Sequence, residues 1–298
     1  MSELAVGEFE KIAAGTYLEG LAVDSSRDAV WYSDVIGGGV HGRMPDGSIT
    51  TFNAERMWTG GVLLNNDGAV LSSGAGGIMW NHPDTGKSGW LLKEIDGEPI
   101  NGINEMIPDG TGGIYFGTVD LERVARGEEP RPSALYRLTD EGDVIKLVDG
   151  LRFPNGIAMS PDRKRLYCNN TFVSTLAFDM LSDFTLANMA TFFVKDDVDG
   201  IATDAEGNLW ITGFRSGYLT RVNPDGKELA RLETPAGAIT QIRFGGADMR
   251  DYYINTVPVD GGDSLKEGKP VTEKASCMYR GRSNVPGMII PPARFKLI

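Results

Sequence analysis

The sequence has little sulfur and little imidazole. Its 298 residues include two cysteines, Cys168 and Cys277, and two histidines, His41 and His82. Two cysteines cannot form a framework of several disulfides, and so few histidines and cysteines leave too few ligands for a zinc site of the usual His/Cys type. Any metal ion that this chain binds would therefore be held mainly by oxygen.

Basic residues are also scarce, and long apolar segments are missing. The chain has 29 lysines and arginines against 41 aspartates and glutamates, which gives a formal net charge of −12. This charge repels phosphate backbones and anionic membranes, so we expect no nucleic-acid partner and no membrane partner. No apolar run approaches the roughly 18 residues that span a bilayer, and residues 1–7 lack the features of a secretory signal. We expect a cytoplasmic protein, and its oligomeric state stays open.

Sustained helical periodicity is absent as well, and the stretch 120–127 predicts one short turn of helix at most. Glycine, in contrast, is abundant at 39 residues. Many of these glycines follow aspartate or asparagine, which is the turn chemistry of tight hairpins between short strands. These features predict an all-β chain.

A recurring unit organises the sequence. It consists of a polar or small residue, a glycine, an aliphatic stretch, an Asp-rich turn and an aromatic strand, and its clearest copy is DGIATDAEGNLWITG, which begins at Asp199. Six copies begin at positions 19, 60, 104, 155, 199 and 240, with separations of 41, 44, 51, 44 and 41 residues. Such a period is typical of the four-stranded blade of a β-propeller. A β-sandwich with accidental periodicity is the alternative.

The six copies predict a six-bladed β-propeller of four-stranded antiparallel blades, as a single domain over residues 1–298. The last copy ends after a strand at 276–281, whereas a short strand at 9–13 precedes the first copy. We therefore expect the N-terminal strand to complete the last blade and close the ring. The stretch 258–275 is expected to be a long loop, either a lid or a solvated insertion.

The inner strands of a propeller begin near the central channel, so the six leading residues should converge at one end of it. These residues are Glu19, Gly60, Asn104, Asn155, Asp199 and Thr240. Two carboxylates and two amides would be costly to bury unpaired, and a divalent cation removes that cost. We expect one ion, Ca²⁺ first, with Zn²⁺, Mn²⁺, Mg²⁺ or Fe²⁺ as alternatives. Taken singly, each residue also has a purely structural interpretation, because Asp and Asn before Gly form turns.

Several segments carry a family resemblance, among them PNGIAMSPD at 154–162 and DGIATDAEGNLWI at 199–211. With LEG at 18–20 and INE at 103–105, the whole chain resembles the SMP-30/gluconolactonase/LRE family of six-bladed propellers. The resemblance implies metal-assisted hydrolysis of a lactone. It places the metal ion on the four residues Glu19, Asn104, Asn155 and Asp199, in agreement with the repeats.

The resemblance also implies that Asp199 is the general base for the attacking water, with a role as metal ligand only as the alternative. Sugar-acid lactonases of this family place an arginine two residues before the third-blade asparagine, where this chain has Gly102. An acidic residue after the GT at 117–118 is retained as Asp120 or Glu122, and we expect it to contact the substrate.

Trp58 and Phe153, on loops at the same face, predict a more apolar mouth than a polyol needs. We interpret the chain as a metal-dependent lactonase or carboxylic ester hydrolase, whose lactone substrate is less polar than a sugar-acid lactone. The alternatives are a non-catalytic calcium-binding or scaffold propeller, and a hydrolase of another ester or a phosphoester bond.

Overall fold

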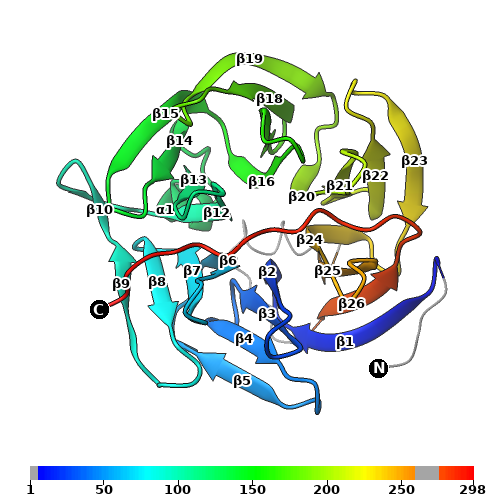
Figure 1. Cartoon of the computed structure of the whole chain (residues 1–298), viewed down its shortest axis with the longest axis horizontal. Helices are drawn as coiled ribbons and strands as arrows, with labels where there is room; N and C mark the ends of the chain where they lie inside the picture. Colours follow the sequence, from blue (N-terminus) through cyan, green and yellow to red (C-terminus); the bar gives the residue numbers. More distant parts are fainter. Residues whose placement is uncertain (1–5, 259–274) are drawn as a thin grey trace.

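The computed structural model describes residues 6–258 and 275–298, and β-strands dominate it. Six four-stranded antiparallel sheets form a ring in which each inner strand contacts the inner strands of both neighbouring blades (Figure 1). The prediction of a six-bladed β-propeller is confirmed, and the β-sandwich alternative is wrong. Of the loop predicted at 258–275, all but the two end residues lie outside the described part of the chain.

In blades 1 to 5 the chain runs from the channel outward through all four strands, and in blade 6 it does so through the first three. Blade 1 consists of β2 (Leu18–Asp24), β3 (Ala29–Asp34), β4 (Val40–Arg43) and β5 (Ile49–Phe52). Blade 2 consists of β6 (Thr59–Leu64), β7 (Val70–Gly74), β8 (Ile78–Asn81) and β9 (Ser88–Leu92). Blade 3 consists of β12 (Ile103–Pro108), β13 (Ile114–Thr118), β14 (Ser133–Leu138) and β15 (Val144–Leu151). Blade 4 consists of β16 (Pro154–Met159), β17 (Arg165–Asn170), β18 (Ser174–Met180) and β19 (Leu186–Phe193). Blade 5 consists of β20 (Val198–Thr203), β21 (Leu209–Gly213), β22 (Tyr218–Val222) and β23 (Glu228–Glu233). Blade 6 consists of β24 (Ala238–Gly245), β25 (Asp251–Val257), β26 (Ser276–Arg282) and β1 (Phe9–Gly15). A small ribbon, β10 (Glu94–Ile95) with β11 (Glu98–Pro99), joins blades 2 and 3.

The N-terminal strand closes the ring. Strand β1 is the outermost strand of blade 6, where it pairs with β26 and sets Ala14 opposite Cys277. The predicted closure is thus confirmed. The predicted helical turn forms as α1 (Leu121–Ala125). No helix in the described ranges has the length and apolarity needed to cross a bilayer.

The hydrophobic core lies between the blades. Between blades 1 and 2, for example, Trp31 and Val40 pack with Val62 and Val70, and a similar cluster fills the contact between blade 6 and blade 1. Each fully buried aliphatic side chain of this kind contributes about 1.5–3 kcal/mol. The joint that closes the ring is therefore packed in the same way as the other joints.

The C-terminal segment 283–298 crosses the ring where the inner strands end (Figure 1, red). The backbone N–H of Met288 donates to the carbonyl of Thr203 at 2.9 Å, and that of Ala293 donates to the carbonyl of Leu64 at 2.9 Å. Thr203 and Leu64 are the last residues of β20 and β6. The segment therefore covers the end of the channel opposite to the leading residues.

Candidate active site

A β-bulge interrupts the inner strand of every blade at or beside its leading residue. In blade 1, Leu18 pairs with Asp34 and Leu21 pairs with Tyr32, so the inner strand has one extra residue. The same register shift occurs in the other five inner strands. Because a bulge bends a strand and redirects its side chains, this repeated irregularity turns the leading residues toward one end of the channel.

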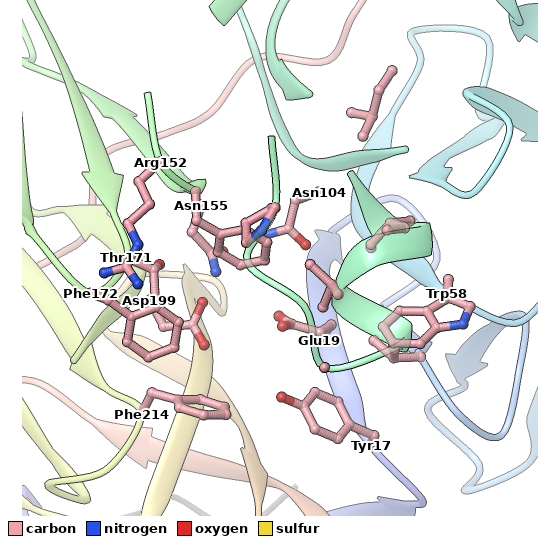
Figure 2. Close-up of a pocket in the computed structure, with 18 of the residues that line it drawn as sticks. Tyr17, Glu19, Trp58, Asn104, Arg152, Asn155, Thr171, Phe172, Asp199 and Phe214 are labelled. Atoms are coloured by element: carbon pink, nitrogen blue, oxygen red, sulfur yellow. The ribbon is translucent and has the colours of Figure 1, made fainter. Parts of the chain in front are cut away.

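A cavity of about 480 Å³ lies at that end. The four predicted metal ligands all line it, from four different blades (Figure 2): Glu19, Asn104, Asn155 and Asp199. Gly60 also lines the cavity, but it has no side chain that could bind a metal ion. Thr240 has a different role, because its hydroxyl donates to the carbonyl of Leu18 at 2.6 Å and joins blade 6 to blade 1.

Hydrogen bonds between blades hold the backbone of the leading residues. The side-chain amide of Asn169 in blade 4 donates to the carbonyl of Asp199 in blade 5 at 2.7 Å. The amide of Asn255 in blade 6 donates in the same way to the carbonyl of Glu19 in blade 1 at 2.6 Å. Both donors are on the second strand of their blade. The backbone at Asp199 and Glu19 is therefore held by contacts with the neighbouring blade rather than carried on a free loop.

The two carboxylates at the cavity are electrostatically strained. Burial and the nearby charge of Glu105 raise the pKa of Glu19 to about 8. Burial, Glu19 and Glu105 raise the pKa of Asp199 well above its usual range. The Oδ1 atom of Asp199 is buried without a hydrogen-bond partner, which costs about 1–3 kcal/mol for an ordinary polar group. A divalent cation between these carboxylates would supply both the missing charge and the missing partner.

Beneath this ring of donors, Glu105, Gln241 and Arg243 form a buried polar network. Gln241 Nε2 donates to Glu105 Oε2, Arg243 donates to Gln241 Oε1 at 2.7 Å, and the Arg243 guanidinium lies 3.4 Å from the Glu105 carboxylate. Ideal Cβ atoms at Gly61 and Gly200 would each lie 2.5 Å from a side-chain oxygen of this network. Sequence reasoning missed it, although Glu105 and Gln241 follow their leading residues at the position where the other four blades have glycine.

Aromatic side chains form much of the cavity wall. Trp58 and Phe153 line it, together with Tyr17, Phe172 and Phe214. Trp58 and Phe172 have φ angles of 58° and 66°, in the left-handed region that bulky residues rarely adopt. Such backbone strain persists only where the surrounding structure imposes it, and it is frequent at ligand-binding sites.

The family model described as "SMP-30/Gluconolactonase/LRE-like region" matches residues 18–258. The chain belongs to this family. It is 25% identical to pentonolactonase XacC of Haloferax volcanii over 269 residues, which cover 84% of this chain and 85% of that one. It is 26% identical to the 6-deoxy-6-sulfogluconolactonase of Pseudomonas putida over 281 residues, covering 90% and 91% of the two chains.

The fold is also that of a solved relative. The crystal structure of a calcium-binding protein, regucalcin from Agrobacterium tumefaciens, superposes with a TM-score of 0.79 at 19% identity. The match covers 99% of this chain and 98% of that chain. At this identity the likeness demonstrates the shared propeller fold alone.

Asp120 and Glu122, which were predicted to contact the substrate, do not line the cavity in this chain, whereas Leu121 and Val124 do. Residues three apart in a helix share one face, so the face of α1 turned to the cavity is apolar. Asp120 instead caps α1, where its carboxylate accepts from the backbone N–H of Arg123 at 3.3 Å. The short helix could be predicted from the sequence, but its orientation could not.

Two arginines at the cavity were not predicted. Arg152 and Arg215 both line it, and their guanidinium carbons lie 5.6 and 5.2 Å from the ring centroid of Phe172. Arg152 also forms a salt bridge with Glu129 at 2.7 Å. Neither arginine occupies a leading position in the repeat, so the repeat alignment contained no signal for them.

Among the described residues, no three His, Cys, Asp or Glu side chains group together as a metal site. A metal ion in this cavity therefore depends on the two amides, Asn104 and Asn155, in addition to the two carboxylates. These four side chains would bind the ion through oxygen atoms only, which are the ligands that hard divalent cations prefer.

Proposed function

We propose that this chain is a divalent-metal-dependent hydrolase that opens a lactone, a cyclic ester. The observation that carries the proposal is a pair of carboxylates, the partly buried Glu19 and the buried Asp199, which face one cavity from different blades beside two amides. The unpartnered Asp199 Oδ1 marks the place where a ligand is needed. The two relatives that are named as lactonases support the same reaction.

The donor set fits a metal ion, which Glu19, Asn104, Asn155 and Asp199 would hold. We take Ca²⁺ as the first expectation, since the donors are hard oxygens and the Agrobacterium relative is a calcium-binding protein. Mg²⁺, Mn²⁺, Zn²⁺ and Fe²⁺ are the alternatives, because each also binds oxygen-rich sites. When bound, the ion would polarise the carbonyl of the ester as a Lewis acid.

Asp199 is the proposed general base. Its carboxylate takes a proton from a water molecule, whose oxygen forms a bond to the carbonyl carbon of the lactone. The bond between that carbon and the ring oxygen then breaks, and Asp199 returns its proton to the released alkoxide. The product is the open hydroxy acid, and the carboxylate of Asp199 is regenerated.

The proposed substrate is less polar than a sugar-acid lactone. An ideal Cβ atom at Gly102 would lie 2.5 Å from Leu121 Cδ1, so Leu121 occupies the space that a larger side chain at position 102 would need. Leu121, Val124 and Trp58 make one wall of the cavity apolar, whereas Arg152, Arg215 and the proposed metal ligands line other parts of it. Such a wall offers few hydrogen-bond partners to the hydroxyl groups of a sugar acid and suits an aliphatic or aromatic lactone.

A hydrolysis screen tests the proposal. Full-length protein is treated with a chelator, reloaded with Ca²⁺, Mg²⁺, Mn²⁺, Zn²⁺ or Fe²⁺, and assayed by pH indicator on gluconolactone, γ-nonalactone and dihydrocoumarin. We expect metal-dependent turnover, faster with the last two lactones than with gluconolactone. Stoichiometric metal binding without turnover of any ester would instead favour a calcium-binding or scaffold protein, and turnover of phosphoesters alone would favour a different bond.

The base is tested by substitution. Asp199→Asn should lower kcat by about 10²-fold or more while the circular dichroism spectrum stays unchanged. Asp149→Asn is the matched control, because this carboxylate on the outermost strand of blade 3 is 68% exposed. Full activity in Asp199→Asn would refute the role of Asp199 as base.

A further inference from the structure

The cavity contains a second buried polar atom that the protein leaves without a partner. Of the buried side-chain atoms without a hydrogen bond in the described residues, those of cavity-lining residues are Asp199 Oδ1 and Thr171 Oγ1. Thr171 is 3% exposed. An unsatisfied buried hydroxyl destabilises a protein, and a ligand in the cavity would satisfy this one.

Thr171 is held firmly in place next to the strand that supplies Asn155. Its backbone N–H donates to the carbonyl of Phe153 at 2.9 Å. The side-chain oxygen of Asn170 in turn accepts from the backbone N–H of Arg152 at 3.0 Å and of Phe153 at 2.9 Å. These reciprocal bonds join the end of β17 to the segment before β16, so the position of Thr171 is coupled to that of Asn155.

Thr171 also lies on the side of the cavity where the proposed chemistry takes place. Figure 2 shows it beside Asp199 and Asn155, away from Trp58 on the opposite wall. The next residue, Phe172, has the strained φ of 66° and lies under the guanidinium groups of Arg152 and Arg215. These contacts hold the turn that follows Thr171.

We propose that Thr171 is a substrate-binding residue whose hydroxyl donates a hydrogen bond to an oxygen of the ester group of the lactone. The inference rests on the proposed lactonase function and adds a contact to it. It assigns the two walls of the cavity different tasks: the blade 4 side receives the ester group, and the apolar side around Trp58, Leu121 and Val124 receives the hydrocarbon part of the substrate.

The test compares Thr171→Val with Thr171→Ser and with Thr212→Val. Thr212 is the matched control, because its hydroxyl is also buried without a partner but it does not line the cavity. Metal-loaded full-length variants are assayed on the lactone that wild type hydrolyses fastest among gluconolactone, γ-nonalactone and dihydrocoumarin. Thr171→Val should lower kcat/KM by roughly 10-fold or more, whereas Thr171→Ser and Thr212→Val should stay within about 3-fold of wild type.

Two further measurements separate this role from others. Urea unfolding of Thr171→Val should show no loss of stability relative to wild type, because no hydrogen bond within the protein is lost and an unsatisfied buried hydroxyl is removed. Calorimetric titration with Ca²⁺ should give the wild-type affinity, which separates contact with substrate from contact with the metal ion.

Thr171→Val with wild-type kcat/KM, or with a loss matched by Thr212→Val, would overturn the inference and leave the lactonase proposal standing. A wild-type protein that hydrolyses none of the lactones would overturn the proposed function, and this inference with it.

Discussion

Gln241 of blade 6 donates a hydrogen bond to Glu105 of blade 3 across the centre of the ring, because these two blades are opposite each other. Arg243 supplies the balancing charge, 3.4 Å from Glu105 and equally buried. The channel is thus filled by a polar network directly below the proposed metal ligands. The negative charge of Glu105 is one reason why the pKa values of Glu19 and Asp199 are raised.

This network makes Glu105→Gln a strongly destabilising change. Arg243 would remain buried without an opposite charge, and breaking a buried ion pair in this way typically costs about 3–5 kcal/mol. Glu206→Gln is the control, because Glu206 is 63% exposed in its salt bridge with Arg221 and should matter by less than about 1 kcal/mol. Urea unfolding of the full chain measures both, and equal effects of the two changes would contradict the prediction.

The stability of the chelator-treated protein should fall as the pH rises from about 4.5 to about 8. The pKa of Glu19 is raised to about 8 in the folded chain, from an ordinary value of about 4.5. Between these values the unfolded chain has released a proton that the folded chain keeps, so the free energy of unfolding decreases with pH. Urea unfolding in chelator at several pH values measures the slope, which Glu19→Gln should reduce but not abolish, because the raised pKa of Asp199 acts in the same direction.

Adding Ca²⁺ should reverse this trend. The ion competes with protons for the same carboxylates, so its apparent affinity should increase up to about pH 8. At a free concentration of 100 times the dissociation constant, the ion should add about 2.7 kcal/mol to the free energy of unfolding. A calcium affinity that does not change between pH 6 and pH 8 would contradict the assignment of Glu19 and Asp199 as ligands.

The contact between Gly102 and Leu121 should determine the preference for apolar lactones. Gly102→Arg alone should destabilise the protein, because the new side chain collides with Leu121. The double variant Gly102→Arg/Leu121→Ala provides space and adds a polar group to the wall. Its ratio of kcat/KM for gluconolactone over γ-nonalactone should exceed that of Leu121→Ala alone by about 10-fold, measured by pH indicator. An unchanged ratio would show that this wall does not select the substrate.

The C-terminal segment should depend on Asn65 for its attachment. The Asn65 side chain donates to the carbonyl of Phe295 at 3.0 Å and accepts from its N–H at 2.9 Å. Asn65→Ala removes both bonds and should lower stability by about 1–3 kcal/mol, with faster hydrogen exchange in residues 290–298. Asn66→Ala is the control, because Asn66 is exposed and bonds to Ala293 only through its backbone N–H. Equal exchange in both variants would argue against this attachment.

Much of the ring could be predicted from the sequence because each blade is a local unit. The hydrophobic stretches, turn residues and leading residues recur with one phase, so six blades, the closure by β1 and the convergence of Glu19, Asn104, Asn155 and Asp199 follow from the spacing alone. Trp58 and Phe153 were predicted for the same reason, since both precede an inner strand. Metal binding by Glu19, Asn104, Asn155 and Asp199, and the role of Asp199 as general base, remain predictions.

Only the tertiary structure decided the features that join distant parts of the chain or depend on an orientation. The link between Glu105 and Gln241 spans 136 residues, and no local pattern encodes which side chains meet across a channel. The residues of α1 that line the cavity depend on which face of a single helical turn packs inward. They are Leu121 and Val124 rather than the expected Asp120 and Glu122. The lack of a hydrogen-bond partner for the Thr171 hydroxyl likewise depends on how all the side chains around it pack. A repeat determines what recurs in each blade, whereas packing determines what differs between blades, and the site consists of both.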